Sequence, residues 1–223
     1  MRPTCLLLDL DGTLVDSAPG VTAGAAAALR GVGAAVPDEH TLRSFVGPPM
    51  YESFRRVVGL DEASAALALR AYRAHYAEHG LLDSALFPGI PETLDALAAA
   101  GLPMAVATSK VEDQALRLVR HYGLDTRLEA VCGICDQDGR TTKQQVIRAC
   151  LERLRELGVD TSRPLMVGDR SYDVTSAAAE GVPAVHVLWG YGGTSESEGA
   201  IASVAAPAGL VELLTGVTAG QVN

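Results

Sequence analysis

The sequence predicts an α/β protein in which helices cover both faces of a parallel β-sheet. Short apolar runs of the length of a buried strand alternate with longer helical patterns, which is the rhythm of successive βαβ units. Four of the helical patterns are followed by glycine, the residue most common just beyond a helix C-terminus. Aromatic residues make up only 4% of the chain, and the Ala-rich composition favours helices over a β-sandwich.

The expected elements follow in order along the chain. Four short apolar runs are typical of buried strands, at residues 5–8, 104–107, 165–167 and 184–188. Four helical patterns, each closed by a glycine, are found at residues 91–100, 111–122, 142–157 and 173–180. After the last expected strand, a Gly/Ser/Thr-rich loop at 190–197 precedes a short helix at 209–214.

The segment between the first strand and residue 86 interrupts this alternation, because no strand pattern appears in it. Val21, Ala25 and Leu29 recur at helical spacing, and Asp61 can cap a further helix. The Gly-Pro-Pro sequence at 47–49 predicts a turn between helical pieces. We therefore expect a core domain of residues 1–15 and 87–223 and an inserted, all-helical cap domain of residues 16–86.

The charge balance excludes one class of partner. The chain of 223 residues has 18 Lys and Arg residues against 27 Asp and Glu residues, a formal net charge of −9. Because binding to DNA or RNA depends mainly on basic side chains, no nucleic acid polymer is expected as a partner. No segment approaches the ~18 apolar residues of a membrane span, and the N-terminal apolar run is too short for a signal peptide. We expect a cytoplasmic protein without membrane contact, as a monomer or homodimer.

The four cysteines do not form the pattern of a disulfide framework. Cys132 and Cys135 are the only close pair, and a zinc site would need two further ligands at comparable spacing. We therefore interpret the cysteines as small buried hydrophobic residues.

Polar residues follow three of the expected strands directly. They are Asp9-Leu10-Asp11-Gly12-Thr13, Thr108-Ser109-Lys110 and Gly168-Asp169-Arg170-Ser171-Tyr172-Asp173. Ligands of open parallel sheets bind beyond the carboxyl ends of the strands, so these residues are expected to lie together. Converging carboxylates repel one another unless a cation lies among them, and their oxygen atoms suit Mg²⁺. A threonine hydroxyl and a lysine are groups that a phosphoryl group needs around its outer oxygens.

Four motifs in this order resemble the haloacid dehalogenase-like hydrolases: DLDGT near the N-terminus, a threonine closing the second strand, a lysine leading into a helix, and GDRSYD after the third strand. The resemblance covers essentially the whole chain. It implies a Rossmann-like core with an inserted helical cap, Mg²⁺ as the cofactor, and a small phosphorylated metabolite as the substrate.

The resemblance also implies a role for each motif residue. Asp9 would be the nucleophile that forms an aspartyl-phosphate, and Asp11 the general acid and base. Mg²⁺ would be held by Asp9, the backbone carbonyl of Asp11 and Asp169, while Asp173 would orient metal-bound water molecules. The phosphoryl group would be bound by Thr108, Ser109 and Lys143.

The lysine motif departs from the family pattern, in which Pro-x-Pro usually follows the lysine. Here Lys143 is followed by Gln144 and Gln145. We favour Lys143 because it precedes a helix whose first turn can direct it at the site, and Lys110 is the alternative.

The residue at position 11 distinguishes branches of the family. Dehalogenases that resemble this chain carry an aromatic residue there and phosphonatases a small apolar one, so Asp11 indicates a phosphatase or a phosphomutase. The sequences at 45–49 and 187–192 are most similar to the phosphoglycolate phosphatase and 5′-nucleotidase-like branch. Phosphoglycolate and nucleoside monophosphates are therefore candidate substrates of a Mg²⁺-dependent phosphatase.

Two other functions stay open. A β-phosphoglucomutase-like phosphotransferase would share the core, but its relatives use a His and an Arg of the cap, and here Val21 and Pro48-Pro49 stand at the matching positions. An inactive binding or regulatory module would be expected to have lost one of the four aspartates, which are all present: Asp9, Asp11, Asp169 and Asp173.

Two smaller expectations concern the loops. Gly168 is expected to let the backbone turn sharply before Asp169. Asp136 and Asp138, close to Gly139, are expected to form a turn rather than a second metal site.

Overall fold

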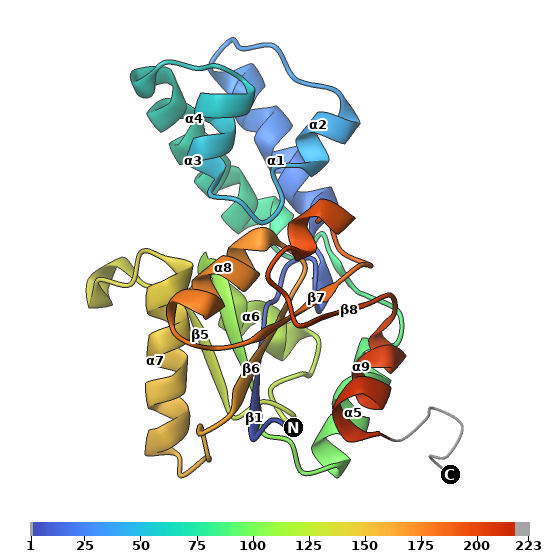
Figure 1. Cartoon of the computed structure of the whole chain (residues 1–223). Helices are drawn as coiled ribbons and strands as arrows, with labels where there is room; N and C mark the ends of the chain where they lie inside the picture. Colours follow the sequence, from blue (N-terminus) through green and yellow to red (C-terminus); the bar gives the residue numbers. More distant parts are fainter. Residues whose placement is uncertain (1, 217–223) are drawn as a thin grey trace. The chain divides into compact units, whose positions relative to one another are not determined.

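The computed structural model describes residues 2–216. Within them the chain divides into two compact units (Figure 1). The first contains the residues up to Leu14 and those from Leu86 onward, and the second contains Val15–Ala85. That the second unit acts as a cap domain stays a prediction.

The first unit is built on a six-stranded sheet, which confirms the predicted α/β class. The strand order is β5-β4-β1-β6-β7-β8, and every pairing within the sheet is parallel. Its strands along the chain are β1 Cys5–Leu8, β4 Met104–Val111, β5 Ala130–Ile134, β6 Pro164–Gly168, β7 Ala184–Val187 and β8 Ala202–Val204.

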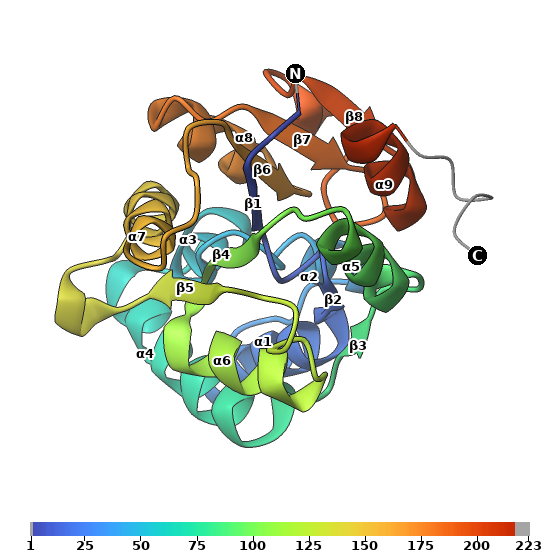
Figure 2. The same ribbon diagram turned by 90° about the horizontal axis from the view of Figure 1, so that it is seen from below.

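Helices cover both faces of this sheet (Figure 2). On one face lie α5 Ile90–Ala99, α6 Glu112–His121 and α9 Pro207–Thr215. On the other face lie α7 Lys143–Glu156 and α8 Ser171–Ala179. The boundaries fall close to those predicted, and α9 begins two residues earlier than expected because Pro207 is well suited to a first helical turn.

The sequence prediction missed two strands of the sheet. β5 contains Gly133, which weakened its strand pattern, but a Cβ atom at this position would lie 2.5 Å from the carbonyl oxygen of Lys110 in β4. The glycine therefore lets two neighbouring strands approach closely. β8 has only three residues, too few for a periodicity to be recognised.

The register of the central strands brings the end of β1 level with the end of β6, whereas β4 continues to Val111, beyond the end at residue 107 that the sequence predicted. Leu8 at the end of β1 lies opposite Val106 in β4 and Val167 in β6. All four residues of β1 are buried, as expected for a strand covered on both faces. The residues that follow β1 and β6 therefore emerge at the same edge of the sheet, beside the last residues of β4.

The second unit is mainly helical. It contains α1 Ala18–Gly31, α2 Glu39–Arg43, α3 Met50–Glu52, a π-helical turn η1 Ser53–Val57, α4 Glu62–His75 and a second π-helical turn η2 Tyr76–Gly80. Asp61 caps α4 as predicted, since its side chain accepts a hydrogen bond from the amide of Ser64. The expectation that segment 16–86 holds no strand is wrong at its ends, where the two-residue strands β2 Val15–Asp16 and β3 Ala85–Leu86 pair with each other.

Candidate active site

The site lies where the direction of the chain connections reverses within the sheet. From β1 the chain continues to β4 and β5 on one side, and later to β6, β7 and β8 on the other. This strand order is that of Rossmann folds, which bind ligands outside the strand ends at the reversal. Asp9 follows β1 and Asp169 follows β6, so the two aspartates lie on either side of this point.

Three of the predicted carboxylates converge there. Asp9, Asp169 and Asp173 each offer one oxygen, and the three oxygens lie within 4.8 Å of one another. These residues are 6%, 0% and 2% exposed, so water screens their mutual repulsion only weakly. Within the described part of the chain, this is the only group of at least three His, Cys, Asp or Glu residues with metal-binding spacing.

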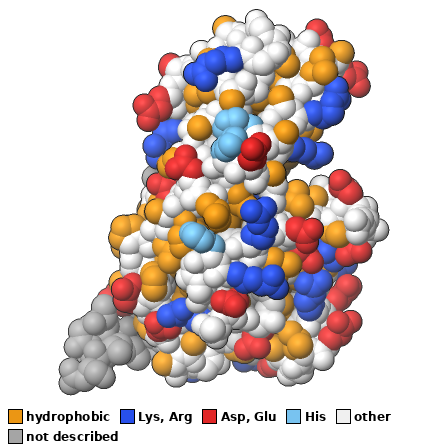
Figure 3. Space-filling view, turned by 180° about the vertical axis from the view of Figure 1, so that it is seen from behind, with side chains coloured by type: hydrophobic (Ala, Val, Ile, Leu, Met, Phe, Trp, Pro, Cys, Tyr) orange, Lys and Arg blue, Asp and Glu red, His pale blue; other side chains and the backbone are white. Residues whose placement is uncertain are grey.

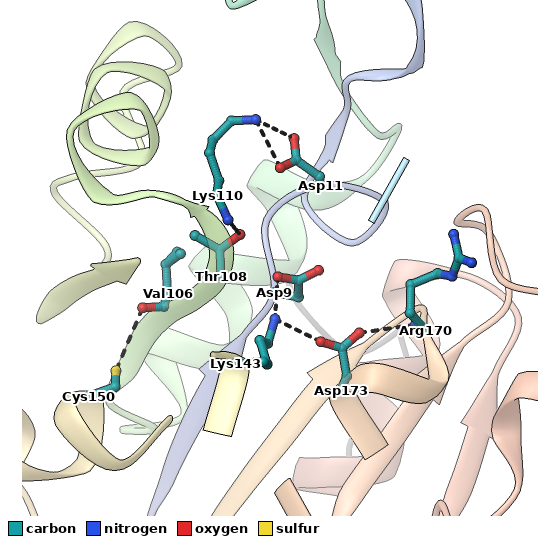
Figure 4. A network of polar contacts seen from close by, with 9 residues as sticks. All are labelled: Asp9, Asp11, Val106, Thr108, Lys110, Lys143, Cys150, Arg170 and Asp173. Carbon is teal, nitrogen blue, oxygen red and sulfur yellow. Dashed lines mark hydrogen bonds and ion pairs between the residues drawn. The ribbon is translucent and has the colours of Figure 1, made fainter. Parts of the chain in front are cut away.

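Lys143 reaches the same cluster from the start of α7 (Figure 4). Its Nζ lies 2.6 Å from Oδ1 of Asp9 and 2.7 Å from Oδ1 of Asp173. Thr142 and Gln145 form a capping box at this helix end, which fixes the first turn that carries Lys143. Three carboxylates against one ammonium leave two negative charges, the charge that one divalent cation balances.

Burial and the neighbouring charges shift the pKa values of these groups. Burial raises the pKa of Asp9 to about 7 against the opposing effect of Lys143. Burial, with the charges of Asp173 and Asp9, raises the pKa of Asp169 to about 8. Burial alone would lower the pKa of Lys143, but Asp173 and Asp9 outweigh it and raise that pKa. Without a cation, the site therefore holds protons near neutral pH.

The loop after β7 supports Asp169, which the sequence analysis did not foresee. The backbone amides of Tyr191 and Gly192 lie 2.7 and 3.4 Å from Oδ2 of Asp169. A Cβ atom at Gly192 would lie 1.8 Å from the carbonyl oxygen of Asp169, and one at Gly190 would lie 2.4 Å from its Cβ. The repeated glycines of 190–193 are a signal of this close approach, although the sequence assigns this segment to a loop and to a family-branch motif and not to the support of Asp169.

One oxygen of Asp169 is left over. Its Oδ1 is buried and has no hydrogen-bond partner among the described residues. Burying a carboxylate oxygen without a partner costs free energy, and a cation is the partner that binds a carboxylate most strongly. This oxygen is therefore available as a ligand for a metal ion.

Gly168 serves the site in a different way from the one expected. It does not have a positive φ, so the sharp turn that we predicted is not the reason for the glycine. A Cβ atom here would lie 2.2 Å from the carboxylate of Asp173, so the missing side chain makes room for that group. Asp173 is held in this space by the backbone amide of Arg170, 3.0 Å from its Oδ2.

The remaining predicted residues come from β4 and the turn after β1. Thr108 is buried, whereas Ser109 is exposed. Nζ of Lys110 lies 3.0 and 2.9 Å from the two carboxylate oxygens of Asp11. The two candidate lysines thus contact different aspartates.

Other sequence observations have a structural explanation. Asp136–Asp138 forms a single 3₁₀ turn that ends at Gly139 with φ of 70°, as predicted. Cys132 is buried and Cys135 half-buried, and both are free thiols.

None of the described helices has the length and hydropathy needed to cross a bilayer. The face in Figure 3 carries basic side chains interspersed with acidic ones.

The fold and the strand-end carboxylates together define a class of protein. The sequence model described as haloacid dehalogenase-like hydrolase matches residues 6–187, and the chain belongs to that family. The crystal structure of "a predicted phosphatase from Clostridium acetobutylicum" superimposes with a TM-score of 0.88 at 30% identity, covering 97% of this chain and 100% of that one. These findings confirm the predicted family and the Rossmann-like fold.

Several named relatives are similar over most of the chain. Tyrosine-protein kinase PtkA of Mycobacterium tuberculosis is 44% identical over 190 residues, covering 85% of this chain but 64% of the relative. The chain thus spans less than two thirds of that relative. A 5′-nucleotidase of Pseudomonas aeruginosa is 38% identical over 197 residues, covering 88% and 87%. A phosphoglycolate phosphatase of Rhodospirillum rubrum is 34% identical over 198 residues, covering 85% and 81%.

Proposed function

We propose that this protein is a Mg²⁺-dependent phosphatase that hydrolyses a small phosphomonoester through an aspartyl-phosphate on Asp9. The observation that carries the proposal is the buried cluster of Asp9, Asp169 and Asp173, with Lys143 bonded to two of its members. Structural ion-pair networks seldom leave a surplus of buried negative charge, whereas a site for a metal cation requires it.

The residues present fit Mg²⁺. The ligand set contains only oxygen donors, which this ion prefers, and its two surplus negative charges match a dication. The unpartnered Oδ1 of Asp169 supplies a donor with no other use among the described residues. Asp9 and Asp169, with the backbone carbonyl of Asp11, would hold the ion, and Asp173 would orient its water molecules. The bound ion would screen the approach of one anion to another.

Asp9 is suited to act as the nucleophile. In the first step a carboxylate oxygen of Asp9 forms a bond to phosphorus, and the ester P–O bond breaks. Lys143 lies 2.6 Å from this carboxylate, where its charge also opposes the charge of the transferring group. The hydroxyl groups of Thr108 and Ser109 would bind the outer oxygens of the phosphoryl group.

Asp11 would move the protons of both steps. In the first step it donates a proton to the leaving alkoxide, which departs as an alcohol. In the second it takes a proton from water as the water oxygen bonds to phosphorus and the P–O bond to Asp9 breaks. Asp9 is thereby restored as a carboxylate and inorganic phosphate is released.

The relatives define the candidate substrates. A nucleoside monophosphate is suggested by the 5′-nucleotidase relative and phosphoglycolate by the phosphoglycolate phosphatase relative. We also propose that Val15–Ala85 acts as the cap domain, on which substrate choice depends in proteins of this family. A β-phosphoglucomutase-like transfer and an inactive binding module remain as alternatives.

A second candidate is transfer of a phosphoryl group to a protein tyrosine. It is favoured by the relative with 44% identity that is named as a tyrosine-protein kinase. The two candidates differ in the phosphoryl acceptor, which is water in one case and a tyrosine hydroxyl in the other.

One set of assays separates these functions. Phosphate release is measured with 5′-nucleotides, sugar phosphates and phosphoglycolate, each with Mg²⁺ and with EDTA. A phosphatase gives EDTA-sensitive release from at least one ester, and acid quenching during turnover traps a phosphorylated protein that Asp9→Asn does not form. Transfer of label from ATP to a tyrosine peptide, without ester hydrolysis, would support the kinase instead. No turnover and no labelling with any compound would favour a binding module.

A further inference from the structure

We propose that Lys110 is a positioning residue that holds the carboxylate of Asp11 in place for its acid and base steps. The inference rests on the proposed function, in which Asp11 transfers the protons. It gives Lys110 a task separate from that of Lys143, so the two lysines are not alternatives for one role.

The contact between Lys110 and Asp11 is bidentate. Nζ of Lys110 lies 3.0 Å from Oδ1 and 2.9 Å from Oδ2 of Asp11 (Figure 4). A single hydrogen bond lets a carboxylate rotate about its last bond, whereas contacts to both oxygens fix that rotation as well. The Lys110 and Asp11 side chains are only 6% and 14% exposed, so water competes weakly for either partner.

Lys110 lies in β4, the strand that also carries Thr108. Its amide donates a hydrogen bond to Oγ1 of Thr108 over 3.2 Å. Thr108 is 1% exposed and lies in β4, next to β1 in the sheet. Lys110 therefore joins the turn that carries Asp11 to the strand that carries the predicted phosphate ligand, and a small displacement of a catalytic group lowers the rate strongly.

The composition of the chain adds an independent observation. Only two of its 18 Lys and Arg residues are lysines, and these are Lys110 and Lys143. Each contacts an aspartate of the site, Lys143 in a buried contact and Lys110 in a part-buried one. In a chain that uses arginine for nearly every other cation, a lysine is expected where a compact point charge is needed instead of a planar guanidinium.

The competing role for Lys110 is direct binding of the transferred phosphoryl group. The two roles differ in their dependence on the leaving group. A phosphate ligand assists every ester equally, whereas a residue that positions the acid matters most when the leaving oxygen needs a proton. Because kcat/KM reports the steps up to the first P–O cleavage, it isolates the donation step from the later hydrolysis of the aspartyl-phosphate.

The test measures kcat/KM for para-substituted phenyl phosphates, from p-nitrophenyl to p-methoxyphenyl, with Mg²⁺ present. In Lys110→Met we expect the value for p-methoxyphenyl phosphate to fall about tenfold or more beyond the fall for p-nitrophenyl phosphate. Asp11→Asn is expected to give a larger difference of the same kind between the two esters. The double variant Asp11→Asn with Lys110→Met is expected to show the same difference as Asp11→Asn alone. Lys110→Gln, which offers Asp11 an uncharged amide donor in place of the ammonium group, repeats the measurement in a second variant.

The outcomes separate the inference from the proposed function. The positioning role would be overturned if Lys110→Met lowered kcat/KM equally for all esters. It would also be overturned if the double variant showed a larger difference between the esters than Asp11→Asn alone. Either result would leave the phosphatase assignment intact. If Asp11→Asn itself shows no difference between the esters, Asp11 is not the acid, and the proposed mechanism and this inference are both wrong. Arg148→Met is the matched control, because it removes a cation paired with Glu180 at the surface and is expected to change none of these values.

Discussion

Nζ of Lys143 donates a hydrogen bond to Oδ1 of Asp9 over 2.6 Å, although the two residues lie 134 positions apart in the chain. Both side chains are buried, so the pair neutralises charge that water does not reach. The contact places the only ammonium group of the carboxylate cluster, among the described residues, against the proposed nucleophile. The first two predictions concern its two members.

Asp9→Asn is expected to reduce Mg²⁺-dependent hydrolysis of p-nitrophenyl phosphate by more than about 10³-fold, because an amide is a poor nucleophile toward phosphorus. Release of p-nitrophenolate measures this directly. Asp136→Asn is a matched control, since Asp136 is exposed in a turn apart from the carboxylate cluster. Activity of Asp9→Asn close to wild type would show that another residue attacks.

Lys143→Met is expected to abolish activity and to lower the melting temperature in EDTA. Removing one partner of a buried ion pair costs about 3–5 kcal/mol, because the carboxylates are left without their cation. Added Mg²⁺ should restore more of the melting temperature in this variant than in the wild type, since the ion replaces part of the lost charge. A variant that keeps both activity and stability contradicts the role given to Lys143.

The stability of the metal-free protein is expected to fall as the pH rises through about 7 to 8, the pKa values of Asp9 and Asp169 in the folded state. Both values lie above those of an unfolded chain, so the folded state holds extra protons below this range and loses that advantage above it. Mg²⁺ binds the ionised carboxylates, so its stabilising effect should instead grow with pH. Thermal unfolding with Mg²⁺ and with EDTA, at about pH 6 and about pH 9, measures both trends, and a Mg²⁺ effect independent of pH would contradict them.

Gly192→Ala is expected to weaken Mg²⁺ binding by about 10- to 100-fold, because the added methyl group would displace the backbone that holds Asp169. Titration of the melting temperature with Mg²⁺ measures the change in affinity. Gly31→Ala is the matched control, since a Cβ atom there has open space within 4 Å and Gly31 ends a helix of the second unit. Equal affinities in the two variants would mean that the loop after β7 does not support the metal site.

Sequence reasoning recovered the class of the fold and most of its elements because buried parallel strands and helix caps leave local signals. The run Cys5–Leu8 and the helix cap at Asp61 are read from neighbouring residues, and the structure has both. Sequence reasoning missed β5 because its Gly133 makes space for β4, which is distant in the chain. It missed β8 because three residues are too few to show the alternating pattern of a strand. The reason for Gly168 was misjudged for the same cause, since its neighbour Asp173 contacts it only across the folded backbone.

By itself, the sequence determined which chemical groups end the strands and in what order, because strand ends and the residues after them are adjacent in the chain. Only the tertiary structure decided how those groups are paired. Lys143 contacts Asp9 and Asp173, whereas Lys110 contacts Asp11, which lies 99 residues away in the chain. Such partners are brought together by the register of parallel strands and by a glycine-lined loop. The free energy of a buried charge depends on the distance to its partners, and no local sequence pattern encodes that distance.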